Sequence, residues 1–281
     1  MKLHLLHQTI LLAAIAVSQL NCTDSKDGKV RPEIAVANSY LKCVVSDLSG
    51  GRTQALCLTP PGMCPGHFDI SPPQIDQLRG CRILLLFDFQ SSLEDMLKRL
   101  QDKGLEMHVV RPRPGLCIPD TYMDIAEDVS EILSTQYPAR RNLYEKRLAA
   151  MKKRLGECGD EAVNEIRRRR LNGSAVLASD HQDRFCAWLG LKVTSTFSGR
   201  DVQTASGLNS SLRGLAGRPI RFVIANKQEG TGLAEALADH LGARMVVFSN
   251  FPDASTEENQ CLCFDRLMQR NLSALFEAAG R

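Results

Sequence analysis

The chain has 281 residues, of which 43% are hydrophobic and 24% are charged, a composition typical of globular proteins. Its formal net charge is +3, from 35 basic and 32 acidic residues, and only 5% of the residues are aromatic. This near balance of charge and the scarcity of stacking side chains argue against a nucleic-acid-binding protein. The length suits two domains or one large one, with a core that needs no metal or disulfide.

The first residues have the order of a secretory signal. Lys2 precedes an apolar stretch over 9–20, and a polar run follows Cys22. We predict that residues 1–22 are a signal peptide and that Cys22 is cut and acylated as in a bacterial lipoprotein. Residues 19–21 are not the small ones that the lipoprotein peptidase prefers, so cleavage without acylation is the alternative. We expect a periplasmic or surface protein that meets the membrane only through a lipid anchor, because no other apolar stretch is long enough to span it.

Strand and helix patterns alternate over residues 30–115, which we assign to an N-terminal α/β lobe. The run Ile83–Phe87 is apolar throughout, as in a parallel strand buried on both faces. Such alternation indicates a parallel sheet covered by helices. We expect strands over 33–37, 54–58, 82–89 and 107–110, and helices over 40–48, 71–80 and 92–103.

The segment 116–171 has helical spacing and few strand signals, so we predict linking helices there, one of them long, with Gly156 or Gly159 bending or ending it. The alternation resumes in a C-terminal α/β lobe over 172–281. The predicted fold is α/β: two lobes, each with a parallel sheet flanked by helices, joined by a long helix, with the ligand site between them. Expected strands are 174–178, 192–196, 220–225 and 244–248, and expected helices are 182–188, 208–215, 233–241 and 262–279.

Several segments resemble the metal-binding receptors of zinc and manganese ABC importers. The loop 60–72 has a Pro-Pro-Gly turn, then His67, then a Ser-Pro helix start. The stretches 120–154, 178–191 and 221–225 resemble further segments of that family, in the same order. The resemblance implies the two-lobed fold, a transition-metal ion such as Zn²⁺ as transported ligand, an ABC transporter permease as partner, and a monomer.

The resemblance also implies metal ligands, and here the chain departs from the family pattern. His67 matches a family ligand and His181 follows the strand that carries another. Cys117 stands where a second His is expected. An acid after the strand near residue 248 often completes the family's site, which makes Asp253 a candidate and Glu229 another.

Zinc accepts imidazole, thiolate and carboxylate donors, usually four in a tetrahedron. We therefore predict a site built by His67, Cys117 and His181, and a thiolate among them would favour zinc or a softer ion over manganese. Cys64 lies three residues before His67 and can join or replace it. A disulfide competes with ligation at both cysteines, because export favours disulfides and the chain has ten cysteines.

The sequence contains no nucleophile elbow, phosphate-binding P-loop, His-Glu-x-x-His helix or Cys-x-x-Cys pair. We therefore expect a receptor without enzymatic activity. Two alternatives stay open. One is a metal-free member of the same fold that binds another small ligand or a protein partner, and the other is a cysteine-dependent redox protein of the cell envelope.

Overall fold

The computed structural model describes residues 32–59, 70–90, 104–199, 218–252 and 263–280, together with positions 93, 97, 98, 101 and 215. The strands are β1 (Ile34–Val36), β2 (Ala55–Cys57), β3 (Ile83–Phe87), β4 (Glu106–Val110), β5 (Ala175–Ser179), β6 (Lys192–Phe197), β7 (Phe222–Asn226) and β8 (Arg244–Phe248). The helices are α2 (Ser39–Ser49), α3 (Pro72–Leu78), α5 (Pro119–Gln136), α6 (Arg141–Arg168), α7 (Asp183–Trp188), α9 (Gly232–Leu241) and α10 (Cys263–Gly280). These elements confirm the predicted order of strands and helices, while the predicted helix 208–215 and most of 92–103 lie outside the described residues.

Short-range signals set the ends of several elements. Asn38 caps α2 because its Oδ1 accepts a hydrogen bond of 3.0 Å from the backbone N–H of Leu41. Gly50 ends the same helix with φ of 65°, a left-handed conformation that glycine adopts without a Cβ penalty. Pro72 opens α3, where its missing N–H costs no helical hydrogen bond. These positions show why the helix boundaries could be predicted closely.

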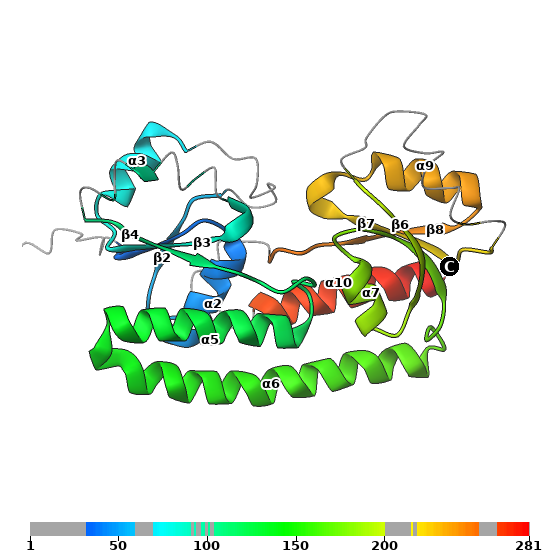
Figure 1. Cartoon of the computed structure of the whole chain (residues 1–281). Coiled ribbons are helices and arrows are strands. Elements are labelled where there is room, and N and C mark those ends of the chain that lie inside the picture. Colours follow the sequence, from blue (N-terminus) through cyan, green and yellow to red (C-terminus); the bar gives the residue numbers. More distant parts are fainter. Residues whose placement is uncertain are drawn as a thin grey trace, which may run out of the picture. The chain divides into compact units, whose positions relative to one another are not determined.

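Two four-stranded sheets carry the fold, and every strand pair in them is parallel. Their strand orders are β2-β1-β3-β4 and β6-β5-β7-β8, so the two lobes repeat one topology (Figure 1). In the first sheet, the chain leads from the central strand β1 to one edge of the sheet and from the central strand β3 to the other edge. The second sheet repeats this reversal with β5 and β7. Parallel sheets of this kind bind ligands beyond the carboxyl ends of their strands, at this point of reversal.

Side chains alternate across the central strands and so build separate cores on the two faces of each sheet. Ile83, Leu85 and Phe87 of β3 join one core, while Leu84 and Leu86 join another. The first of these cores is shared by both lobes, because it continues through α2, α5, α6, α7 and α10 to the facing side of the second sheet. The outer faces have their own smaller cores, against α3 in one lobe and α9 in the other.

The long helix α6 is unbroken from Arg141 to Arg168 and runs beneath both sheets (Figure 1). The prediction that Gly156 or Gly159 bends or ends it is wrong. Gly159 lies where α6 meets the start of α5 and the end of α7, and a Cβ there would come 3.3 Å from Trp188 Cζ2 and 3.4 Å from Pro119 Cγ. Close packing between helices, rather than a break, explains this glycine.

Polar and aromatic contacts join the lobes beside the shared core. The guanidinium of Arg154 on α6 donates to Asp47 Oδ2 of α2 at 2.8 Å and lies 3.3 Å from Asp265 Oδ1 of α10. The rings of Tyr40 on α2 and Phe251 after β8 meet edge to face, with centroids 6.3 Å apart. Among the described helices, none is long and apolar enough to cross a bilayer.

Candidate metal centre at the strand ends of the second lobe

The topology places two predicted ligands at the reversal point of the second sheet. His181 follows β5 by two residues, and Glu229 ends a short 3-10 helix, Lys227–Glu229, that follows β7 directly. Because β5 and β7 are neighbours and parallel, both side chains leave the same edge of the sheet. Two residues that are distant in the sequence therefore come into direct contact.

His181 and Glu229 form a pair, with His181 Nδ1 lying 2.8 Å from Glu229 Oε1. The imidazole is half exposed, at 51% of its side-chain area, whereas the carboxylate is 7% exposed. Ser179, the last residue of β5, donates from Oγ to Glu229 Oε2 at 2.5 Å. Burial pushes the pKa of Glu229 up, but the hydrogen bonds from His181 and Ser179 outweigh it and lower the pKa below its ordinary value.

The backbone of His181 is held from both sides. Its N–H donates to Ser179 Oγ at 3.3 Å, and its carbonyl accepts from Asn250 Nδ2 at 3.2 Å. Gly199 lies against the carboxylate partner, because a Cβ at this position would come 2.6 Å from Glu229 Cβ. The backbone that carries the half-exposed imidazole is therefore held in place by hydrogen bonds to Ser179 and Asn250.

Cys117 lies just before α5 and is 1% exposed. Its Sγ is 3.0 Å from the carbonyl oxygen of Ser249 and 3.3 Å from Asn250 Oδ1, and it accepts from Asn271 Nδ2 at 3.4 Å. Burial raises the pKa of this thiol far above its ordinary value, against a smaller opposite effect of the Asn271 amide. The Cys117 thiol and the His181 carbonyl thus contact the two polar atoms of one amide, that of Asn250.

A cluster of amides, which we call the amide cluster (Gln182, Asn226, Gln228, Asn250 and Asn271), supports both predicted ligands, and all its members except Gln228 are buried. Gln182 Nε2 donates to Asn250 Oδ1 at 3.1 Å and to Asn226 Oδ1 at 3.3 Å. Gln228 Oε1 accepts from the Asn250 N–H at 3.1 Å. Sequence reasoning missed this cluster. The sequence did carry a signal for it, because β5 and β7 end in a polar residue and polar residues directly follow β8.

The first lobe has a smaller counterpart at the equivalent strand ends. Asn38, two residues after β1, donates from Nδ2 to Gln90 Oε1 at 2.8 Å, and Gln90 follows β3. Both side chains are fully buried. Each sheet thus ends in buried amides at its reversal point, and the second lobe adds the imidazole and the carboxylate.

Four of the predicted site residues fall outside the described residues: Cys22, Cys64, His67 and Asp253. The structure places Cys117, His181 and Glu229, and it pairs the last two directly. Within the described part of the chain, no group of three His, Cys, Asp or Glu side chains lies close enough to hold a metal ion.

Six of the described cysteines, including Cys117, are thiols and not halves of disulfides. The alternative of a disulfide at Cys117 is therefore wrong for this structure, because its sulfur is surrounded by amide and carbonyl partners. Burial raises the pKa of Cys57 and that of Cys81 to about 11. Redox catalysis needs a thiolate with a lowered pKa, so these thiols do not favour the envelope redox alternative.

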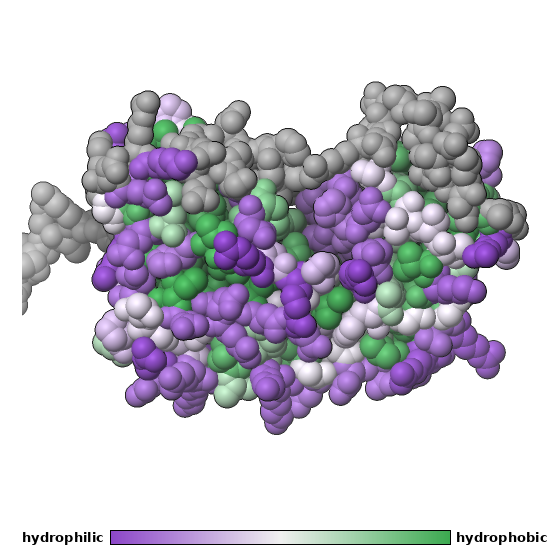
Figure 2. All heavy atoms as spheres, viewed as in Figure 1, coloured by the Kyte–Doolittle hydropathy of each residue, from purple (hydrophilic) through white to green (hydrophobic). Residues whose placement is uncertain are grey.

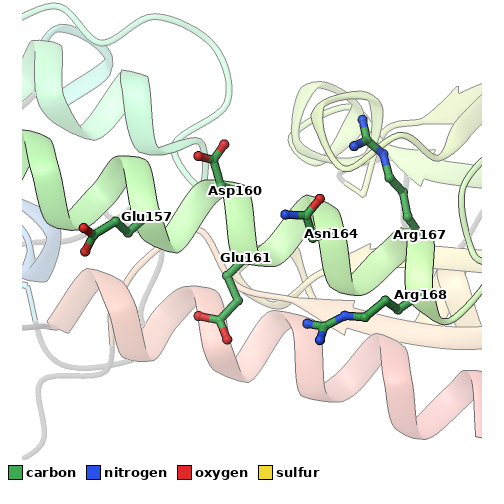
Figure 3. Close-up of a pocket in the computed structure, with 6 residues that line it drawn as sticks. All are labelled: Glu157, Asp160, Glu161, Asn164, Arg167 and Arg168. Carbon is green, nitrogen blue, oxygen red and sulfur yellow. The ribbon is translucent and has the colours of Figure 1, made fainter.

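Two hollows lie elsewhere on the described surface. One is lined by side chains of α6, which leave the helix in different directions without converging (Figure 3). The edge of the molecule along which α6 runs is mostly hydrophilic (Figure 2). The residues that line this hollow are Glu157, Asp160, Glu161, Asn164, Arg167 and Arg168. The other, of about 150 Å³, lies between β8 and α10 and is lined by Lys227, Val247, Ser249, Phe251, Leu267, Arg270 and Asn271. Neither contains His181.

Two parallel sheets of one topology, joined by a long helix and carrying polar groups at their strand ends, define a two-lobed solute-binding protein. The family described as zinc-uptake complex component A, periplasmic (ZnuA), matches residues 117–278. The chain therefore belongs to this family of metal-binding solute-binding proteins of ABC importers.

Solved structures show the same fold over nearly the whole chain. The solute-binding protein FpvC of Pseudomonas aeruginosa, in complex with Ni²⁺, superposes with a TM-score of 0.70 at 16% identity, covering 89% of this chain and 97% of that one. A crystal structure of ZnuA gives 0.67 at 16% identity, with 87% and 97% covered. The Mn-bound periplasmic metal-binding protein of Candidatus Liberibacter asiaticus gives 0.71 at 11% identity, with 88% and 98% covered. No curated protein sequence matches the chain.

Proposed function

We propose that this protein is an extracytoplasmic receptor that captures a divalent transition-metal ion, zinc first, between its lobes and delivers it to an ABC permease. The observation that carries the proposal is His181. It is a half-exposed imidazole, fixed through Nδ1 by a buried carboxylate, at the strand ends where parallel sheets bind ligands. Membership of the zinc-uptake family and the Ni²⁺ and Mn²⁺ complexes of relatives support a metal cargo.

The proposed donors are His181 from the second lobe and His67, which lies between β2 and α3 in the sequence. Cys117, Asp253 and Cys64 remain proposed donors for the other positions. A cation held by groups from both lobes would couple the relative position of the lobes to occupancy, which a permease can sense. Ligation by Cys117 requires its thiol to lose a proton and its hydrogen bonds to Ser249 and Asn250, so we rank it below the two imidazoles.

Elemental analysis of the natively purified protein tests the proposal. We expect one transition-metal ion per chain in the wild type and its loss in His67→Ala and in His181→Ala. His240→Ala is the matched control, because His240 lies in the last turn of α9, and it should keep the metal. Wild-type protein that stays metal-free after incubation with Zn²⁺, Mn²⁺ and Ni²⁺ would contradict the proposal.

One observation favours a second candidate, a metal-free member of the family that binds another small ligand or a protein partner. The family position that we matched to a His ligand carries Cys117, and that thiol is buried, neutral and hydrogen-bonded within the protein. This candidate predicts that no metal raises the Tm of the purified chain. It also predicts that His67→Ala and His181→Ala melt at the same temperature with and without Zn²⁺.

Export and anchoring belong to the same proposal. The family is described as periplasmic, which agrees with a signal peptide over residues 1–22. We further propose that Cys22 is acylated and that the mature protein is a monomer. Mass spectrometry of the N-terminal peptide from membrane-extracted protein tests whether Cys22 is acylated. If it is, Cys22→Ser should release the chain from the membrane fraction.

A further inference from the structure

We infer that Glu229 is a positioning residue and not a ligand: together with Ser179 it sets the tautomer of His181, so that Nδ1 carries the proton and Nε2 is presented to the ion. This inference rests on the proposed function and deepens it. It assigns separate tasks to two residues that the sequence analysis treated alike, as candidate ligands.

The first argument is that both carboxylate oxygens of Glu229 already have a close polar neighbour. Oε1 lies 2.8 Å from His181 Nδ1, and Oε2 accepts from Ser179 Oγ at 2.5 Å. The side chain is 7% exposed, so an ion could reach it only after these contacts break. A carboxylate in this state serves better as an acceptor for an imidazole N–H than as a donor to a metal.

The second argument concerns the geometry of the imidazole. When Glu229 accepts from Nδ1–H, the neutral ring has its lone pair on Nε2. His181 keeps 51% of its side-chain area exposed while its Nδ1 lies 2.8 Å from Glu229 Oε1, so part of the ring stays open to solvent beside this contact. Ligating histidines usually donate their other N–H to a carboxylate or carbonyl, which orients the ring and raises its basicity.

The third argument is that the backbone and Ser179 pack closely around this pair. Gly199 passes so close that a Cβ would come 2.6 Å from Glu229 Cβ and 2.9 Å from its Oε2. Ser179 also accepts the backbone N–H of His181 at 3.3 Å, so one hydroxyl positions both members of the pair. The carboxylate is therefore built into the strand ends and is not a flexible surface group.

Nitrogen-15 NMR of the metal-free full-length protein at pH 7.5 tests the tautomer directly. We expect His181 to show a protonated Nδ1 and an unprotonated Nε2 in the wild type, assigned by comparison with His181→Ala. In Glu229→Ala, we expect the proton to move to Nε2. Ser179→Ala should shift the balance in the same direction but less. Glu235→Gln is the control, because Glu235 is exposed on α9, and its spectrum should match the wild type.

Zinc affinity, measured by competition with a chelating dye, tests the consequence. Loss of a carboxylate behind a ligating histidine typically weakens metal binding about 10- to 100-fold. We expect this loss in Glu229→Ala and Glu229→Gln, with one ion per chain still bound, a smaller loss in Ser179→Ala, and none in Glu235→Gln. Thermal unfolding of each variant shows whether it is folded.

Several results would overturn the inference. One is an imidazolium or an Nε2–H tautomer at His181 in the wild type. Others are unchanged zinc affinity in Glu229→Ala, or loss of the ion altogether with an unchanged tautomer, which would make Glu229 a ligand. Failure of the proposed function gives a different result: the wild type binds no metal, whichever tautomer His181 has.

Discussion

Cys117 shows how burial decides the chemistry of a single residue. A thiol is a metal ligand or a nucleophile only as a thiolate. Here the sulfur is 1% exposed, next to a carbonyl oxygen and two amides, and its pKa is raised far above the ordinary value. Because the neutral form is favoured, the thiolate fraction at any given pH is lower than for an exposed cysteine.

We predict that Cys117 resists alkylation in the native protein. With iodoacetamide at pH 8, mass spectrometry should find the Cys117 peptide unmodified, and modification should appear only in denaturant or at much higher pH, where the raised pKa is approached. Cys158 is the internal control, because it is half-buried on α6 and should react faster. Treatment with a metal chelator should change nothing at Cys117. Labelling that appears only after chelation would instead show that a metal protects this thiol.

The candidate site could be predicted only in part from the sequence. His181 and Glu229 were singled out because they follow strands and carry donor atoms, but their pairing depends on β5 and β7 being neighbours in the sheet. Ser179 and Asn250 were missed, because a single polar residue at a strand end resembles any loop residue until its partners are known. The thiol state of Cys117 depends on burial by α10 and by the turn after β8, which no local pattern encodes.

At the scale of elements, the apolar runs were the most reliable signal. The run 83–87 was expected to be a strand buried on both faces, and β3 has this range and is buried at every position. Glycine was the less reliable signal. The glycines in α6 were expected to bend or end it because glycine lowers helix propensity, but packing of that helix against α5 and α7 overrides this weak preference.

The two glycines of α6 should respond in opposite ways to larger side chains. A Cβ at Gly156 meets nothing within 4 Å, so Gly156→Ala should stabilise the protein by up to about 1 kcal/mol through helix propensity. Gly159→Leu should destabilise it by about 1–3 kcal/mol, because the side chain must displace Trp188 or Pro119. Urea unfolding of the two variants beside the wild type measures both changes. A neutral Gly159→Leu would show that the contact between α6 and α7 is loose.

At the scale of the whole molecule, the lobes share one core and one buried charge network. The shared core runs from the first sheet through the helices to the second. Asp47, whose side chain is 0% exposed, lies in the first lobe, and its partner Arg154 also contacts Asp265 of the closing helix. Since neither lobe completes its core alone, we expect the described domain to unfold as one cooperative unit.

Arg154→Met tests this cooperativity. Removing one partner of a buried ion pair typically costs about 3–5 kcal/mol, because the other charge stays buried. We expect a loss of this size, with Trp188 fluorescence, which reports the second lobe, and far-UV circular dichroism showing the same midpoint. Lys153→Met is the matched control. Its side chain is 81% exposed and its Nζ lies 3.9 Å from Glu157 Oε1, so the change should cost at most about 1 kcal/mol. Separate midpoints for the two signals would mean that the lobes unfold independently, because the single tryptophan then follows one lobe while the dichroism follows both.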